Sequence, residues 1–176
     1  MTSTPTGDVD AGEIARRTAD IEEIKRLFAA RLRCMDTKQW DRYASFHTDD
    51  IVSQSWGGLP QDKQPGTDGE ANRVVGGEAL TRAISRLLDG PVFVTTVHHA
   101  HCPEITLTSP TTATGIWSME DKLWWSDVTT EHHLHGYGHY HENYRKVGGQ
   151  WLISYRKLTR LRVDETPGFW SFVEAL

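Results

Sequence analysis

The second half of the chain consists of four long stretches rich in β-branched and aromatic residues, and this feature most constrains the fold. The expected strands cover residues 92–107, 112–125, 130–147 and 151–163. Ser109-Pro110 and Gly148-Gly149 mark short turns between two pairs of these strands, which is typical of antiparallel hairpins. A sheet of this size has to bury one face, so the rest of the chain must cover it.

The first half of the chain has the pattern of such a cover. Over residues 14–35, apolar side chains recur at helical spacing at Ile21, Ile24, Phe28, Leu32 and Met35. The other expected elements are helices at 40–46 and 77–88, a strand at 51–54 and a Gly- and Pro-rich loop at 57–69. This order predicts an α+β cone-shaped barrel, with N-terminal helices packed on a strongly curved, mostly antiparallel sheet. We expect a cavity between helices and sheet.

The length of the chain fits one domain. Its 176 residues contain no internal repeat and no linker-like segment. We expect a disordered segment at 1–10 and a domain at 11–165. The tail at 166–176 (TPGFWSFVEAL) is too apolar for a free end, so we expect it to pack on the domain or on a neighbouring subunit.

Composition argues against several kinds of partner. The net charge of −5 and the scattered basic residues do not form the basic face that binds phosphates. No stretch has the roughly 18 apolar residues of a membrane span, and the first residues contain no apolar signal segment. Cys34 and Cys102 form no CxxC motif, which favours a reducing compartment. We therefore expect a cytoplasmic protein with no nucleic-acid or membrane partner.

Two charged residues lie on or beside the apolar stripe of the first helix. Arg31 completes the face that contains Ile24, Phe28 and Met35, and Asp36 follows at the helix end. Buried charges are costly unless they are paired or hydrated. Either both side chains face the interior, or Arg31 extends to solvent and Asp36 begins a turn.

Eight of the nine histidines lie between His98 and His141, on the strands expected to line the cavity. Alternation places His133, His135, His139 and His141 on one face of their strand, and Leu134, Gly136, Gly138 and Tyr140 on the other. The run at 139–142 (HYHE) fits either a metal site or, with the other outward histidines, an exposed ladder or subunit interface. His98 is different, because it begins a polar run (HHAHCPE) directly after an apolar one (VFVTTV).

Charged residues also share faces with apolar residues in two later strands. Asp121 alternates with Trp117 and Met119, so it is either desolvated, held by a cation, or in water at a strand end. In the last strand, one face carries Arg156, Leu158 and Arg160. That face fits either a solvated edge strand or a cavity wall whose cations reach a ligand oxygen.

These segments resemble a known family. The run at 35–42 (MDTKQWDR) resembles the helix-end motif of scytalone dehydratase, with Met35 in place of its tyrosine and Asp36 retained. The segment at 96–105 resembles the strand that carries the catalytic histidine of that family, here His98. The pattern GYGHYHENYRKVGGQWLISYR resembles the last hairpin of SnoaL-like polyketide cyclases, bile-acid 7α-dehydratases and hexachlorocyclohexane dehydrochlorinase. All are members of the nuclear transport factor 2-like superfamily, and the resemblance covers roughly residues 12–164.

The resemblance implies three catalytic residues. Asp36 and His98 match the Asp–His dyad of the dehydratase-type members, and Asp121 matches by spacing a second carboxylate of the bile-acid enzymes. It also implies a substrate-binding set, which consists of Arg31, Ser55, Trp56, Trp117, Tyr140, Arg156 and Arg160. Arg31 takes the place of a pocket tyrosine or lysine, and Arg160, or alternatively Arg156, matches a late arginine. Ser55 falls near a pocket tyrosine of scytalone dehydratase, so scytalone itself is not the expected substrate.

These residues imply an enzyme of lyase or isomerase type that uses no cofactor and no metal. His98, oriented by Asp36, would take a carbon-bound proton from a small cyclic, polyketide- or steroid-like substrate. Arg31 or Arg160 would stabilise the enolate oxygen, and Asp121 would assist as an acid or by pairing with an arginine. The alternative is a non-catalytic module of the same fold that binds a small molecule. Relatives of this kind form trimers or dimers through the outer sheet face, so we expect a homo-oligomer, and a trimer in preference to a dimer.

Overall fold

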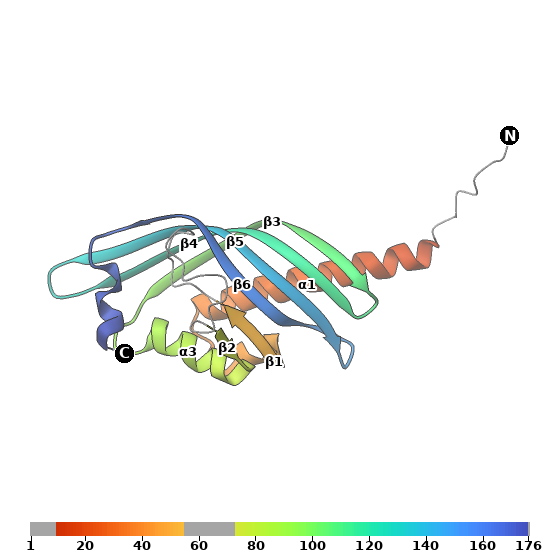
Figure 1. The fold of residues 1–176 in the computed structure, drawn as a ribbon, viewed down its shortest axis with the longest axis horizontal. Helices are drawn as coiled ribbons and strands as arrows, with labels where there is room; N and C mark the ends of the chain where they lie inside the picture. Colours follow the sequence, from red (N-terminus) through yellow and green to blue (C-terminus); the bar gives the residue numbers. More distant parts are fainter. Residues whose placement is uncertain (1–9, 55–72, 176) are drawn as a thin grey trace.

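The computed structural model describes residues 10–54 and 73–175, and its main element is a six-stranded sheet in the order β2-β1-β6-β5-β4-β3. The strands are β1 (His47–Gln54), β2 (Arg73–Val75), β3 (Thr95–Ser109), β4 (Thr112–Ser126), β5 (Glu131–Val147) and β6 (Gln150–Glu165). Neighbouring strands are antiparallel except for β1 and β6, which are parallel. The sheet is curved and does not close on itself (Figure 1). The predicted α+β architecture is confirmed.

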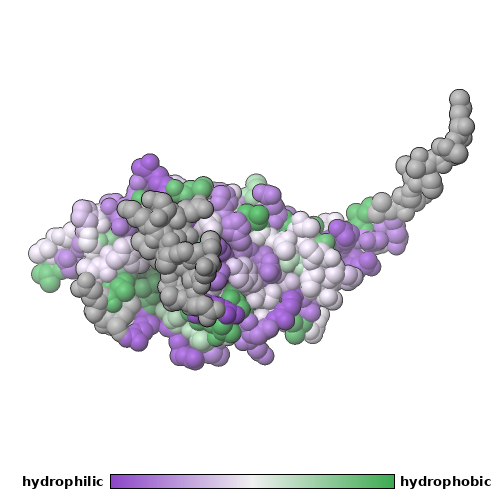
Figure 2. Space-filling view, in the orientation of Figure 1, coloured by the Kyte–Doolittle hydropathy of each residue, from purple (hydrophilic) through white to green (hydrophobic). Residues whose placement is uncertain are grey.

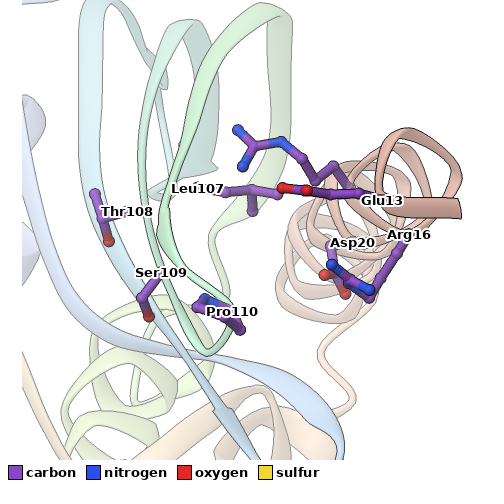
Figure 3. Close-up of a pocket in the computed structure, with 8 residues that line it drawn as sticks. Glu13, Arg16, Asp20, Leu107, Thr108, Ser109 and Pro110 are labelled. Atoms are coloured by element: carbon purple, nitrogen blue, oxygen red, sulfur yellow. The ribbon is translucent and has the colours of Figure 1, made fainter. Parts of the chain in front are cut away.

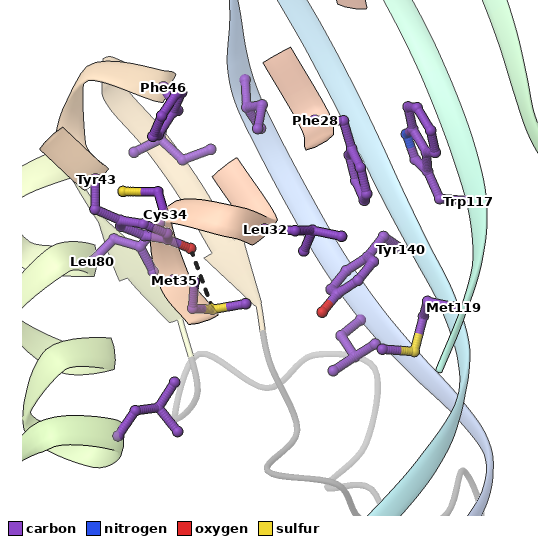
Figure 4. Packing of buried hydrophobic residues seen from close by; sticks show 14 of the residues in the cluster. Phe28, Leu32, Cys34, Met35, Tyr43, Phe46, Leu80, Trp117, Met119 and Tyr140 are labelled. Carbon is purple, nitrogen blue, oxygen red and sulfur yellow. Dashed lines mark hydrogen bonds between the residues drawn. The ribbon is translucent and has the colours of Figure 1, made fainter. Parts of the chain in front are cut away.

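Helices cover the inner face of this sheet (Figure 1). They are α1 (Ala11–Asp36), α2 (Trp40–Tyr43) and α3 (Gly77–Asp89), with 3-10 turns η1 (Ala44–Phe46) and η4 (Phe169–Ala175). The Asp10 carboxylate accepts a hydrogen bond from the Gly12 N–H and so caps the start of α1. The predicted apolar stripe of α1 is buried from Ile24 to Met35, and its Phe28 ring stacks on Trp117 with ring centres 3.9 Å apart (Figure 4). This packing fixes the end of α1 beneath the sheet.

Several boundaries differ from the expected ones. The first strand begins at His47, because the chain already pairs there with Ile153 of β6. The helix expected at 40–46 ends at Tyr43 and continues as the 3-10 turn η1. The strand β2 was not predicted, since three mostly exposed residues give no hydrophobic alternation. The expectations for residues 1–9 and for the loop at 57–69 lie outside the described residues.

The C-terminal segment packs on the sheet. Phe169 and Phe172 of η4 are buried, and the Trp125 indole N–H donates a hydrogen bond to the Phe169 carbonyl oxygen at 2.9 Å. Trp170 lines a cavity together with Leu87 of α3. The segment is apolar because its aromatic rings cover the space between α3 and the sheet of the same chain.

The alternation predicted for β5 is confirmed. Leu134 and Tyr140 are buried on the inner face, whereas His133 is exposed and His135, His139 and His141 are half-buried on the outer face. The metal-site interpretation of residues 139–142 is wrong, because Glu142 faces the interior and its two neighbouring histidines face outward. In the part of the chain that the structure describes, no three His, Cys, Asp or Glu side chains are grouped to hold a metal ion.

The surface shows no extended apolar area in the view of Figure 2, where hydrophobic residues form small separate patches. Among the hydrophobic side chains of the described residues, Phe93 is 60% exposed and Leu161 is 70% exposed. Isolated apolar side chains of this kind are normal on a protein surface. No helix within residues 10–54 and 73–175 has both the length and the apolarity needed to cross a membrane.

Candidate active site

A cavity of about 120 Å³ lies between the end of α1, the helix α3 and the inner face of the sheet. Its polar wall consists of His98, Asp121, Tyr140, Arg156 and Arg160. Met35, Leu123 and Leu158 are among the residues of its apolar wall. The cavity therefore combines an apolar body with a few charged groups, as small-molecule sites do.

A second hollow, of about 150 Å³, lies between the first half of α1 and the turn after β3 (Figure 3). The helix contributes Glu13, Arg16 and Asp20 to it. Asp20 accepts hydrogen bonds from Lys146 and from the Trp151 indole N–H, so its carboxylate already serves to join α1 to the last hairpin. None of the residues predicted for the site lines this hollow, and the cavity that contains His98 is the candidate site.

The end of α1 and the start of β3 bring Asp36 and His98 together. His98 Nδ1 lies 2.6 Å from Asp36 Oδ1, and the His98 backbone N–H donates to Asp36 Oδ2 at 2.9 Å. The Thr96 hydroxyl donates to Oδ1 at 2.8 Å and accepts a hydrogen bond from the Lys38 ammonium at 3.0 Å. Both oxygens of the carboxylate are therefore held. The His98 side chain is only 6% exposed and that of Asp36 is 21% exposed.

These contacts determine the protonation of the pair. Burial raises the pKa of Asp36, but the hydrogen bonds and charge of His98 and the bond from Thr96 outweigh it, so the pKa lies below its ordinary value. An ionised carboxylate only accepts hydrogen bonds, so His98 Nδ1 carries the proton that it donates. His98 Nε2 has no hydrogen-bond partner among the described residues. The neutral ring thus has an unshared electron pair on Nε2, and His98 lines the cavity.

Asp121 is the neighbour of His98 across the β3–β4 ladder, and a cation holds it. Arg160 donates to both of its oxygens, from Nη1 at 2.7 Å and from Nη2 at 2.6 Å, and both side chains are at most 5% exposed. The strand β5 runs between them and has Gly136 at that point. A β-carbon at this position would lie 2.2 Å from Arg160 Nη1. The glycine therefore makes room for the ion pair.

Arg31 belongs to a separate group of buried residues, which we call the inner cluster: Arg31, Glu142, Tyr144 and Trp117. Arg31 Nη2 donates to Glu142 Oε1 at 3.1 Å, and the Tyr144 hydroxyl donates to Glu142 Oε2 at 2.7 Å. The Trp117 indole N–H donates to the Tyr144 oxygen at 2.8 Å. Glu142 outweighs the effect of burial and raises the pKa of Arg31, so the guanidinium stays charged. None of the four residues lines the cavity.

The structure thus brings together some of the predicted residues and not others. Those at the cavity are His98, Asp121, Tyr140, Arg156 and Arg160, with Asp36 behind His98. Arg31 faces inward, as one interpretation required, but it and Trp117 lie in the inner cluster. The last strand forms a cavity wall and not a solvated face. Ser55 and Trp56 lie outside the described residues.

Sequence reasoning missed Thr96, Glu142 and Tyr144. The alternation of β5 contained the signal for the last two, since both share the inner face with Tyr140. Thr96 shares the inner face of β3 with His98, two residues away, and its hydroxyl is buried against Asp36. No spacing rule identifies such a contact between a strand and the end of a distant helix.

Comparison with known proteins agrees with this architecture. Residues 16–157 match the SnoaL-like domain. The chain belongs to the SnoaL-like family. A scytalone dehydratase-like protein from Novosphingobium aromaticivorans superposes with a TM-score of 0.69 at 18% identity, over 87% of this chain and 91% of that one. A type 3 hexachlorocyclohexane dehydrochlorinase from Novosphingobium barchaimii gives 0.68 at 17% identity, over 88% and 94%.

A protein from Kribbella flavida gives a TM-score of 0.68 at 18% identity, over 84% of this chain and 95% of that one. At these identities the likeness shows a shared fold only. The function of this member therefore has to be argued from its own residues.

Proposed function

We propose that this SnoaL-like protein is an enzyme of lyase or isomerase type that needs no cofactor and in which His98 removes a carbon-bound proton. The observation that carries the proposal is the 2.6 Å contact between His98 Nδ1 and Asp36 Oδ1. It fixes the tautomer in which Nε2 is the basic nitrogen of a ring that lines the cavity. A base must lie within reach of the proton that it takes, and its pKa must be near the working pH.

The first step requires Asp36 only as an orienting and stabilising group. When Nε2 takes the proton, the ring becomes an imidazolium, and the adjacent carboxylate stabilises its charge without accepting the Nδ1 proton. The electron pair of the broken C–H bond forms a C=C bond to the neighbouring carbonyl carbon. The electron pair of the carbonyl π bond moves to the oxygen, and the substrate becomes an enolate. If the His98 imidazolium returns its proton to another carbon, the result is isomerisation. If a β-substituent leaves with its bonding electron pair, the result is elimination, and the imidazolium can protonate a departing hydroxyl group so that it leaves as water.

The remaining polar wall suits the charge that develops. Arg160 and Asp121 form a neutral pair beside His98, and Arg156 contributes a cation to the same cavity. Because both Asp121 oxygens accept from Arg160, we assign Asp121 to pairing and not to acid catalysis. A cavity of about 120 Å³ favours a small ring compound over a steroid skeleton within the predicted substrate range. The names of two structural neighbours denote loss of water and loss of hydrogen chloride, which are eliminations.

The test measures proton abstraction directly, without knowledge of the natural substrate. Small cyclic ketones and hydroxyketones are incubated with the protein in D₂O, and loss of the α-proton NMR signals gives the exchange rate. We expect His98→Ala and Asp36→Asn to lower the rate by about 10²–10⁴-fold. His139→Ala, on the outer sheet face, is the matched control and should keep the wild-type rate. If the folded His98→Ala variant exchanges α-protons at the wild-type rate, the proposal is contradicted. If compounds bind to the wild-type protein but none of them exchanges its α-protons, the binding-module alternative is supported.

A homotrimer and a cytoplasmic location remain predictions that accompany this proposal. Light scattering coupled to size-exclusion chromatography measures the first, with a mass of three chains of 19.9 kDa as the expected result.

A further inference from the structure

The hydroxyl group of Tyr140 stands out among the buried polar groups. The residue is 1% exposed and lines the same cavity as His98, yet its hydroxyl has no hydrogen-bond partner among the described residues. Figure 4 shows its ring projecting from β5 toward Leu32 and Met35 of α1. Buried hydroxyl groups are almost always bonded to protein or to an ordered molecule. A hydroxyl in a cavity without a protein partner is therefore available to a ligand.

The ring of Tyr140 lies between two cations. The guanidinium carbon of Arg31 is 5.1 Å from the ring centre and that of Arg156 is 5.4 Å from it. Cations near an aromatic ring withdraw electron density from it, so the phenol O–H becomes a stronger donor. Burial nevertheless raises the pKa of Tyr140 above its ordinary value, and this outweighs the opposite effect of the arginines. The phenol keeps its proton at neutral pH and can donate it in a hydrogen bond.

Two arginines near the cavity are less suited to this task, and the third, Arg156, donates a hydrogen bond to the Tyr43 hydroxyl at 3.3 Å. Arg160 uses Nη1 and Nη2 to hold Asp121, and Arg31 lies outside the cavity wall in the inner cluster. Tyr140 and His98 approach the cavity from two strands that are separated by β4. A ring compound between them can place a C–H bond at His98 and a carbonyl oxygen at the phenol.

We propose that Tyr140 is a catalytic residue whose hydroxyl donates a hydrogen bond to the substrate carbonyl oxygen as that oxygen becomes an enolate. His98 Nε2 takes the carbon-bound proton, the C–H electron pair forms the C=C bond, and the carbonyl electron pair moves to oxygen. The phenol proton stays on Tyr140 throughout. The substrate class is thereby restricted to compounds that carry an oxygen acceptor. This inference rests on the proposed function, since it supplies the oxyanion donor that the base requires.

Binding of 4-nitrophenolate, a stable mimic of an enolate, tests the inference apart from turnover. We compare the dissociation constants of wild-type protein and Tyr140→Phe at about pH 8 by isothermal titration. Nitrobenzene serves as the control probe, because it lacks the phenolate oxygen. We expect Tyr140→Phe to weaken 4-nitrophenolate binding by about ten- to hundredfold, because it loses one hydrogen bond to a charged acceptor. Nitrobenzene affinity and the thermal midpoint should stay unchanged. Tyr137→Phe, on the outer face of β5, is the matched control variant.

Equal affinity of wild type and Tyr140→Phe for 4-nitrophenolate would overturn the inference, as would failure of the wild type to bind it. Either result leaves the exchange experiment with His98→Ala intact, so the two proposals fail separately. In that exchange assay, we expect Tyr140→Phe to lower the rate by about 10²–10³-fold, which is typical of losing one oxyanion donor. A rate equal to that of the wild type would also contradict the assignment.

Discussion

The Arg31–Glu142 pair and the Asp36–His98 pair both join a carboxylate to a nitrogen group beneath the same sheet. In the inner cluster, each Glu142 oxygen has a partner, and both charged side chains are fully buried outside the cavity. In the dyad, the carboxylate is equally well bonded, but His98 keeps one nitrogen without a partner among the described residues. The first arrangement uses both carboxylate oxygens inside the fold, although Arg31 Nε and Nη1 are buried without a hydrogen-bond partner among the described residues. The second leaves His98 Nε2 without a partner in a side chain that lines the cavity.

This difference assigns the inner cluster mainly to the stability of the fold and the Asp36–His98 dyad mainly to the proposed reaction. Removing one partner of a fully buried ion pair costs much free energy, because the other charge remains in the interior. The dyad lies at a cavity and its carboxylate side chain is 21% exposed, so solvent can reach the charge that remains and less free energy of unfolding is lost. Mutations in the inner cluster should therefore act mainly on folding, and mutations in the dyad mainly on turnover.

The largest expected effect is that of Glu142→Gln, which leaves the buried guanidinium of Arg31 without its counter-charge. We expect the free energy of unfolding to fall by about 3–5 kcal/mol in urea denaturation at neutral pH. The control is Asp50→Asn, which removes an exposed carboxylate that pairs with Arg145 and should change the free energy by less than about 1 kcal/mol. Similar losses in both variants would show that the inner cluster has no special role in stability.

The next largest expected effect is a pH dependence of stability caused by His47, a buried histidine near Arg31 of the inner cluster. Burial, with Arg31 and Arg156 nearby, lowers its pKa to about 3. The unfolded chain therefore binds a proton at His47 below about pH 6.5 while the folded chain does not, and stability falls as the pH falls. The slope contributed is about 1.4 kcal/mol per pH unit.

The measurement is the free energy of unfolding of wild type and His47→Gln between about pH 6.5 and pH 4. The wild type should lose about 2–3 kcal/mol more than the variant over this range. Parallel curves for the two proteins would show that His47 binds its proton equally well in the folded and unfolded states, which its burial and the adjacent guanidinium groups disfavour.

The sequence predicted the fold better than it predicted the chemistry of individual side chains. Alternation in β4, β5 and β6 identified the inward-facing residues, because one buried face imposes a period of two on every strand. Helical spacing left open whether Arg31 faces inward or extends to solvent, and only the family resemblance favoured the inward direction that the structure has. The bounds of β1 and β2 depended on pairing between distant segments, which local patterns do not contain.

Partners of the buried charges were the hardest to predict. The sequence allowed Asp121 to pair with an arginine without specifying which one, and only the register of β4, β5 and β6 selects Arg160, across a glycine of β5. Arg31 was assigned to the pocket by the family resemblance, yet it pairs with Glu142 and does not line the cavity. A charged residue on an apolar face thus predicts a buried partner, but the sequence does not determine whether that partner is a side chain or a ligand.

Asp36→Asn gives a smaller change in stability than the inner-cluster variant. We expect a loss of about 2 kcal/mol at neutral pH, because hydrogen bonds to a charged acceptor become bonds to a neutral one. The folded-state pKa of Asp36 is lowered below 3.8, so its stabilisation is complete above that value and is lost as the pH falls through the folded pKa. The difference between wild type and variant should therefore shrink below about pH 4 in urea titrations. A constant difference down to about pH 2 would mean that the charge of Asp36 is unimportant.

The smallest effect tests whether the inner cluster acts as one connected network. Trp117→Phe keeps an aromatic ring against Phe28 but removes the N–H that donates to Tyr144, and we expect a loss of about 1 kcal/mol. If the chain from Trp117 through Tyr144 to Glu142 is continuous, Glu142→Gln already weakens the acceptor that orients the Tyr144 hydroxyl. The double variant should then lose less than the sum of the single losses, by about 0.5 kcal/mol or more. Strict additivity would reduce the cluster to independent pairs, and its stability would then depend on the Arg31–Glu142 contact alone.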